Sequence, residues 1–389
     1  MTSAKTFTIT QPTQIHFGVD IIKTLPLVIE QLGCARPMVV IDPGLQAAGL
    51  ERNVTAPLEE AGLAVTLYAR VDPEPGLRLA DRGAEVAGEN KCDCVVGVGG
   101  GSAMDVAKAI AILLTNGGKA ADYLGLGKIT KPGVPKIMVP TSAGTGSEVT
   151  FTAVFINEDT GSKAGMNGDY LYPDVTLLDP ALTLSLPPHV TATTGIDALT
   201  HAFEAYTSVQ AHPVSEMYSL EAIELIAANI RIAYADGRNM EARANMLLAS
   251  LLGGKALAMA GVGLVHAMAY PLGGLFGVPH GLANAVLLPY VTEYNLIGNL
   301  RKHADLAAIL GYETASLPLR EAADLAVDGL YQLNMDLGIP ETLAELDIPA
   351  DSIPEMADIA LTVARPVENN PRRPSRDDII AIYENAMEG

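Results

Sequence analysis

The sequence predicts an N-terminal α/β domain with a parallel sheet at residues 1–182, followed by an all-helical C-terminal domain at residues 183–389. Short apolar runs alternate with helical patterns up to about Asp179, which is typical of parallel strands covered by helices on both faces. After Pro180 the strand pattern fades, and longer segments with a helical period follow. The proline-rich stretch Asp179–Pro188 is the expected boundary.

The composition indicates a globular protein. The chain has 389 residues, of which 49% are hydrophobic and 18% charged, so it can bury a large core and is not expected to be disordered. The formal net charge of −20 argues against binding to nucleic acid or to an anionic membrane, because both need a basic surface. A small anionic ligand is compatible with this charge, since it needs only one local site.

The three cysteines, Cys34, Cys92 and Cys94, indicate a reducing compartment. An odd number is unsuited to a disulfide framework, and Cys92-Asp93-Cys94 lacks the CxxC spacing of zinc and redox motifs. The segment Met1–Thr6 contains no apolar signal core. We therefore expect a cytoplasmic protein.

Five apolar runs are predicted as the strands of the sheet, and three further segments are predicted as helices. A further run, Phe151–Ile156, is expected to add a strand in a hairpin or at an edge. The predicted strands are Pro37–Ile41, Ala64–Tyr68, Cys94–Val98, Lys136–Val139 and Val175–Leu178, and the predicted helices are Ile21–Leu32, Gly76–Gly88 and Ser102–Leu114.

Four segments of the second domain are predicted as helices, and Asn239 is expected to cap one of them. The apolar stretch Leu247–Val278 is interrupted by Lys255, His266, Pro271 and many glycines. It is therefore expected to be a buried helix pair and not a membrane span, which needs ~20 apolar residues. A cleft between the two domains is the expected ligand site. The four segments are Ser215–Ala233, Met240–Leu252, Leu319–Met335 and Asp377–Met387.

A glycine-rich turn follows the third predicted strand and leads directly into a helix. It consists of Gly99, Gly100, Gly101 and Ser102. Glycines allow backbone N–H groups to approach an anion, and the helix N-terminus adds partial positive charge. Ser102 and Asp105 have the spacing of a capping box. An ordinary tight turn with a helix cap is the alternative, but phosphate binding is the favoured interpretation.

Two further strand ends carry polar residues that suit a dinucleotide. Thr141, Ser142 and Thr145 provide hydroxyl groups after the fourth strand. Asp42 ends the first strand, where a carboxylate can accept hydrogen bonds from an adenosine ribose. The ordinary dinucleotide fingerprint places this acid ~20 residues after the glycines, whereas Asp42 precedes them. The alternative interpretations are that Asp42 is an ordinary turn residue and that a hydroxyl group of the loop caps a helix.

Four residues of the second domain suggest a metal site. Asp197 and His201 lie four residues apart and would share one face of a helix. His266 and His280 follow in apolar surroundings. A single buried histidine is usually an ordinary core residue, but three with an aspartate are unfavourable to bury without a shared partner. Imidazole and carboxylate ligands suit Fe²⁺, Zn²⁺, Mn²⁺ or Co²⁺.

Together these motifs resemble the iron-containing, group III alcohol dehydrogenases, whose fold is similar to that of dehydroquinate synthase. The resemblance covers the chain from about Phe17 onward and includes Asn370-Pro371-Arg372. It implies a Rossmann-like dinucleotide-binding domain and a helical metal-binding domain. The implied metal ligands are Asp197, His201, His266 and His280, and the implied NAD-binding residues are Asp42, Gly99, Gly100, Gly101, Ser102, Thr141, Ser142, Thr145 and Lys163.

One residue departs from the family. Many members have a histidine four residues after the third metal ligand, where this chain has Tyr270. Tyrosine has a reference pKa near ~10 and is a poor base at neutral pH. The proton could leave through Tyr270, a ribose hydroxyl and water, or bypass this residue.

The resemblance implies a metal-dependent dehydrogenase that transfers a hydride between NAD(H) and a small primary alcohol, a diol or the corresponding aldehyde. Fe²⁺ is the expected ion, with Zn²⁺ or another divalent metal as alternatives, and His266 and Tyr270 are the expected catalytic residues. A homodimer or a larger homo-oligomer is expected. The alternatives are an NAD- and metal-dependent lyase or cyclase of the dehydroquinate synthase type, a metallohydrolase, and a non-catalytic metal-stabilised scaffold. The first alternative is disfavoured because residues 197–280 contain only four basic residues, Arg231, Arg238, Arg243 and Lys255.

Overall fold

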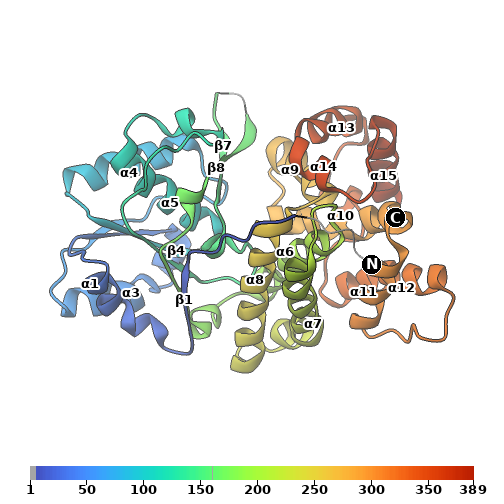
Figure 1. The fold of residues 1–389 in the computed structure, drawn as a ribbon, viewed down its shortest axis with the longest axis horizontal. Coiled ribbons are helices and arrows are strands. Elements are labelled where there is room, and N and C mark those ends of the chain that lie inside the picture. The colour runs from blue at the N-terminus through green and yellow to red at the C-terminus, as the bar shows by residue number, and fades with distance from the viewer. Residues whose placement is uncertain (1–5, 160) are drawn as a thin grey trace. The chain divides into compact units, whose positions relative to one another are not determined.

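The computed structural model describes residues 6–159 and 161–389 (Figure 1). The chain forms two compact units. One is Gln11–Ser185, and the other is Leu186–Gly389 together with residues 6–10. The first unit thus extends to Ser185, and residues 6–10 group with the helical unit.

The first unit contains a six-stranded sheet in which every pair of neighbouring strands is parallel. All five predicted strands are present, so the predicted parallel sheet is confirmed. The sequence did not predict β1, a short edge strand with no fully buried residue. In spatial order the strands are β1 (Gln14–Phe17), β9 (Val175–Leu178), β6 (Lys136–Pro140), β4 (Cys94–Gly99), β2 (Pro37–Ile41) and β3 (Thr66–Tyr68).

Helices cover both faces of this sheet because alternate residues of each strand point to opposite sides. Met38 and Val40 of β2 share a core with α4 and α5, whereas Val39 and Ile41 share a core with α1 and α3. The helices of the first unit are α1 (Leu25–Gln31), α2 (Pro43–Ala47), α3 (Glu51–Glu60), α4 (Leu77–Glu89) and α5 (Gly101–Asn116).

A second, three-stranded sheet adds a hairpin to the first unit. The predicted strand at Phe151–Ile156 is β7 (Thr152–Asn157), which pairs antiparallel with β8 (Ser162–Asn167). β5 (Gly125–Leu126) completes this sheet by pairing with β8. Short 3₁₀ turns connect the elements of this unit: η1 (Ile21–Thr24), η2 (Ala120–Tyr123), η3 (Ser147–Val149), η4 (Asp169–Leu171) and η5 (Pro180–Thr183).

The second unit is helical in every regular element that the structure describes, as the sequence predicts. α6, α7 and α8 pack against one another, and α10 packs against α6, α9, α12 and α15. The helices are α6 (Pro188–Thr207), α7 (Pro213–Ala235), α8 (Met240–Ala260), α9 (Leu264–Phe276), α10 (His280–Asn295), α11 (Leu300–Ile309), α12 (Leu319–Asp336), α13 (Ile353–Thr362), α14 (Ala364–Asn369) and α15 (Arg376–Glu388), with 3₁₀ turns η6 (Leu296–Gly298), η7 (Ala344–Leu346) and η8 (Ala350–Ser352).

The apolar stretch after Leu247 forms two helices that meet at a sharp bend. α8 ends at Ala260 and is followed by its C-cap residue Gly261, whose φ of 71° suits glycine, and α9 continues at an angle of 105°. Within the described residues no single helix is long and apolar enough to cross a membrane, and only this bent pair reaches that length and composition together. Asn239 caps α8 as predicted, since its side chain accepts a hydrogen bond from the N–H of Ala242.

Candidate metal centre and dinucleotide-binding edge

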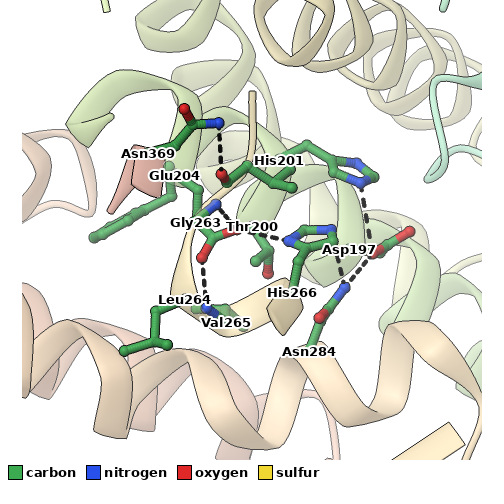
Figure 2. Close-up of polar contacts among 12 residues, drawn as sticks. Asp197, Thr200, His201, Glu204, Gly263, Leu264, Val265, His266, Asn284 and Asn369 are labelled. Atoms are coloured by element: carbon green, nitrogen blue, oxygen red, sulfur yellow. Dashed lines mark hydrogen bonds and ion pairs between the residues drawn. The ribbon is translucent and has the colours of Figure 1, made fainter. Parts of the chain in front are cut away.

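α6 presents the first two residues of the predicted metal site. The helix runs without a break from Pro188 to Thr207, so Asp197 and His201 project from the same face. Both side chains are buried, and Nε2 of His201 lies 4.0 Å from Oδ1 of Asp197. Figure 2 shows these two residues facing His266.

The other two histidines come from the first turns of α9 and α10. The imidazole centroid of His266 lies 4.8 Å from that of His201 and 5.3 Å from that of His280. His280 is the first residue of α10, and its Nε2 lies 3.8 Å from Oδ1 of Asp197. The structure therefore brings together all four residues that the sequence selects.

Three of these four residues present ligand atoms close to one another. One ligand atom each of Asp197, His201 and His266 lies within 4.8 Å of the others. An amide N–H group already occupies this region: Nδ2 of Asn284 lies 2.7 Å from Oδ1 of Asp197, 3.3 Å from Nε2 of His266 and 3.2 Å from Nε2 of His280. Since a hydrogen-bond donor is surrounded here by oxygen and nitrogen acceptors, a divalent cation fits the same donor set.

The surroundings of Asp197 favour its ionised form. Burial raises the pKa of this carboxyl, but the neighbouring His201, His280 and His266 and the hydrogen bond from Asn284 together hold its pKa below the ordinary value. The side chain of His280 is 29% exposed, whereas that of Asp197 is 3% exposed. His280 therefore forms the open side of the cluster.

Two residues of this cluster were not predicted from the sequence. Glu204 lies one further turn along α6, and its Oε2 is 2.6 Å from Nδ1 of His266. Asn284 lies four residues after His280 on α10. Both could have been found from the helical period, because positions 197, 201 and 204 share one face, as do positions 280 and 284.

The predicted cofactor residues lie at adjacent strand ends of the first unit. β4 pairs with β2 on one side and with β6 on the other, with Val98 opposite Ile41 and Gly99 opposite Pro140. The loops that follow these three strands therefore meet at one edge of the sheet.

The glycine turn is tightly packed against its neighbours. Gly99 has a φ of 145°, and a Cβ atom there would lie 2.9 Å from Cβ of Ala103 and 3.3 Å from Oδ2 of Asp42. A Cβ atom at Gly101 would lie 3.0 Å from Cγ2 of Thr145. The positive φ and the contact below 3.0 Å require glycine at position 99, whereas a side chain at position 101 would push Thr145 away by a few tenths of an ångström.

The predicted capping box at the start of α5 is wrong. Ser102 Oγ donates a hydrogen bond to the carbonyl oxygen of Pro73, and Asp105 instead accepts hydrogen bonds from Ser147 Oγ and the N–H of Val154. Asp105 is drawn to the buried side of the helix by these partners. The N-cap residue of α5, Gly100, has no side chain with which to cap the helix, so the backbone N–H groups at this end suit an anionic ligand.

The hydroxyl loop lies against the glycine turn. The N–H of Thr141 donates to the carbonyl oxygen of Gly99 over 3.1 Å. Ser142 Oγ lies 3.6 Å from the Cβ position of Gly100, and Thr145 Oγ1 accepts from the N–H of Ser147 over 3.3 Å. The structure therefore brings Thr141, Ser142 and Thr145 together with the glycines.

The two remaining cofactor residues already have partners. Asp42 caps α2 through Oδ1, which accepts from the N–H of Leu45 over 2.9 Å, while Oδ2 faces Gly99. Nζ of Lys163, on β8, lies 2.8 Å from Oε2 of Glu74, a residue that the sequence analysis did not select. Tyr270 lies in the second unit on α9, with its ring centroid 6.3 Å from that of His280.

Comparison with known proteins identifies the family. Residues 12–180 match the iron-containing alcohol dehydrogenase family, and residues 191–387 match the C-terminal domain of the Fe-containing alcohol dehydrogenase family. The long-chain-alcohol dehydrogenase 1 of Geobacillus thermodenitrificans is 43% identical, over 97% of this chain and 96% of its own length. The NAD-dependent methanol dehydrogenase of Bacillus methanolicus is 34% identical, over 95% of this chain and 97% of its own.

A solved structure agrees with these relationships. A crystal structure of 1,3-propanediol oxidoreductase superimposes with a TM-score of 0.96 at 40% sequence identity, and the match covers 98% of this chain and 100% of that one. The predicted fold class and the predicted dehydrogenase activity are confirmed, and the lyase or cyclase alternative is not supported. The chain belongs to the iron-containing alcohol dehydrogenase family and is a metal-dependent, NAD-linked alcohol dehydrogenase.

Proposed function

We propose that Asp197, His201, His266 and His280 hold the divalent cation of this dehydrogenase. The observation that carries the proposal is the arrangement of one carboxylate and the imidazoles of His266 and His280 around the amide of Asn284, with Nε2 of His201 4.0 Å from the same carboxylate oxygen. We further propose that the glycine turn, the Thr141 loop, Asp42 and Lys163 bind NAD(H). The uncapped N-terminus of α5 supports this assignment, because its N–H groups suit the diphosphate.

The bound groups supply the reactive chemistry: a divalent cation polarises the alcohol or carbonyl oxygen, and the nicotinamide exchanges the hydride. The protein contributes orientation and charge. Asp197 provides one negative charge and the histidines provide neutral nitrogen donors, so the net positive charge of a divalent ion is reduced but not cancelled. We also propose that the hydroxyl group of Tyr270, whose ring centroid lies 6.3 Å from that of His280, accepts or passes on a proton.

We propose small primary alcohols, diols and the corresponding aldehydes as substrates, with Fe²⁺ as the metal. The relatives are named after substrates as different as long-chain alcohols and methanol. These names agree on the oxidation of an alcohol but differ in the alcohol, so the panel of alcohols in the test below has to identify the substrate. We also propose a homodimer or larger homo-oligomer in the cytoplasm. Three free, buried cysteines support a reducing compartment.

The test is to measure metal content and NAD⁺ reduction together. Wild-type protein should retain about one divalent ion per chain and reduce NAD⁺ with a panel of alcohols, measured by absorbance at 340 nm. His266→Ala and His280→Ala should lose both metal and activity. His189→Ala provides the control, because His189 lies exposed at the start of the same helix as Asp197 and should retain both. Full metal occupancy in the His266 and His280 variants would show that these residues are not ligands.

A further inference from the structure

We infer that Glu204 is a positioning residue that sets the tautomer and orientation of His266, and that it does so by binding the N-terminus of α9 at the same time. The inference rests on the proposed metal site. It adds a residue that contacts neither substrate nor cofactor and acts through a ligand.

One carboxylate receives three hydrogen bonds from a single short segment. Oε2 of Glu204 lies 2.8 Å from the backbone N of Gly263 and 2.6 Å from Nδ1 of His266. Oε1 lies 2.6 Å from the backbone N of Val265. Figure 2 shows this carboxylate between the α9 N-terminus and the imidazole. Only 5% of Glu204 is exposed, so water competes little for these bonds.

The contact selects one tautomer of His266. The backbone N–H groups can only donate, so both carboxylate oxygens act as acceptors. Because both oxygens of Glu204 already act as acceptors in this contact, we assign the hydrogen of His266 to Nδ1, which donates it to Oε2. Nε2 then presents its lone pair to the point where Asp197 and Asn284 lie, which is what a metal ligand requires.

The same carboxylate anchors the helix that carries the histidine. α9 begins at Leu264, only two residues before His266, and its N-terminus has no cap from its own N-cap residue, Gly263. Glu204 accepts hydrogen bonds from two buried N–H groups at this helix end that have no acceptor within the helix, and a carboxylate complements the helix dipole there. A Cβ atom at Gly263 would lie 3.1 Å from Oε1 of Glu204, so glycine permits this close contact.

A purely structural role for Glu204 makes a different prediction from a positioning role. Asn370 provides the comparison, because its Oδ1 accepts from the N–H of Leu264 over 3.2 Å and it has no hydrogen bond to His266. If Glu204 only anchors α9, loss of either residue should affect metal binding to a similar degree. If Glu204 positions the imidazole, only its loss should weaken metal binding strongly.

The experiment compares Glu204→Gln, Glu204→Asp and Asn370→Ala with wild-type protein. Metal-free protein is titrated with Co²⁺ in competition with a chelator, and the melting temperature of the metal-free form is measured in parallel. We expect Glu204→Gln to bind Co²⁺ about 10- to 100-fold more weakly, which is the usual effect of losing such a partner. Glu204→Asp, which keeps the charge, should recover part of the affinity. Asn370→Ala should lower the melting temperature and leave the Co²⁺ affinity within about threefold of wild type, because it leaves the carboxylate–imidazole contact unchanged.

Each outcome has a defined meaning. The inference would be overturned if Glu204→Gln bound Co²⁺ with wild-type affinity, or if Glu204→Gln and Asn370→Ala lost Co²⁺ affinity to the same degree. If wild-type protein itself binds no Co²⁺, the proposed metal site fails instead. Should Glu204→Gln not fold, ¹H–¹⁵N NMR of the histidine rings in metal-free wild type decides the point, since a hydrogen on Nε2 of His266 would contradict the proposed tautomer.

Discussion

Nζ of Lys108 lies 2.7 Å from Oγ of Ser147, although the two residues are 39 positions apart in the chain. Lys108 is fully buried on α5, and Ser147 begins the turn that follows the hydroxyl loop. Ser147 in turn donates to Oδ1 of Asp105 over 2.5 Å. This polar chain therefore connects the helix after the glycine turn with the loop that contains Thr141 and Thr145.

The first prediction concerns the stability of this connection. Burial lowers the pKa of Lys108 and raises that of Asp105, so each charge depends on the other. Lys108→Met removes the cation and leaves the carboxylate of Asp105 buried without it. Loss of one partner of a buried pair destabilises by about 3–5 kcal/mol. The double variant Lys108→Met/Asp105→Asn should recover part of this loss in thermal unfolding. A double variant less stable than Lys108→Met would contradict the pairing.

The second prediction concerns Glu148, whose side chain is buried and whose Oε1 has no hydrogen-bond partner among the described residues. Burial raises its pKa from 4.5 to about 7.

Between these two pKa values the folded state binds more protons than the unfolded state, so the free energy of unfolding falls as the pH rises. The contribution of protonated Glu148 to the free energy of unfolding is fully present below pH 4.5 and is lost as the pH passes the raised pKa. The difference between the ordinary and the raised pKa of Glu148 corresponds to a loss of about 3 kcal/mol in the free energy of unfolding. Urea unfolding between pH 5 and pH 8 should show this decrease in wild type and a smaller one in Glu148→Gln; parallel pH dependences would be inconsistent with a buried, titrating Glu148.

The third prediction concerns Asn284 and the metal-free state. Asn284→Asp places a second carboxylate next to Oδ1 of Asp197, where the amide now donates over 2.7 Å. Like charges at this distance disfavour ionisation of both groups, so metal-free protein should melt at a lower temperature. A divalent ion relieves the repulsion, and the increase in melting temperature on adding Mn²⁺ should exceed that of wild type. The double variant Asn284→Asp/Asp197→Asn restores the charge and serves as the control. An equal Mn²⁺-induced increase in Asn284→Asp and wild type would contradict the proximity of the two groups to the ion.

Much of the fold could be predicted because its signals are local. The run Cys94–Val98 and the glycines after it identify β4 and its turn directly. β1 escaped prediction because its residues are at most half-buried and show no continuous apolar run. β8 escaped for a related reason: Ser162–Asn167 contains few apolar residues, and its pairing with β7 comes from the hairpin.

The site was predicted to the extent that residue type alone signals chemistry. Histidine and aspartate in apolar surroundings stand out, whereas Asn284 and Glu204 are common surface residues whose burial appears only in the structure. Asp105 was assigned to a helix cap because local spacing permits it. Its actual partners, Ser147 and Val154, lie more than 40 positions away, and no local pattern reports such contacts.

The fourth prediction concerns Tyr270. If its hydroxyl passes on the proton of the alcohol, Tyr270→Phe should lower kcat by about 10²-fold, the lower end of typical acid–base contributions. The pH dependence of kcat should flatten at the same time, while cofactor KM stays unchanged. Tyr294→Phe is the control, because Tyr294 lies on α10 beside Arg372 and should retain wild-type rates. An unaltered pH–rate profile in Tyr270→Phe would remove this residue from the proton path.

The last prediction concerns cofactor choice. Oδ1 of Asp42 caps α2, and Oδ2 faces Gly99 at the start of the glycine turn. A carboxylate in this position can accept hydrogen bonds from the 2′- and 3′-hydroxyls of the adenosine ribose. The same charge would repel a 2′-phosphate, and like-charge contacts can cost several kcal/mol. Wild-type protein should therefore prefer NAD(H) over NADP(H).

Asp42→Gly should relax that preference without unfolding the first unit, because glycine at an N-cap costs only a few tenths of a kcal/mol relative to aspartate. Most of the change should appear in cofactor KM, since a ribose contact is made equally in the ground and transition states. Steady-state kinetics with both cofactors on wild type and variant provide the measurement, and the melting temperature provides the control for folding. If wild-type protein favours NADP(H), or if the variant has the same ratio of kcat/KM for the two cofactors as wild type, Asp42 only caps α2 and does not contact the ribose.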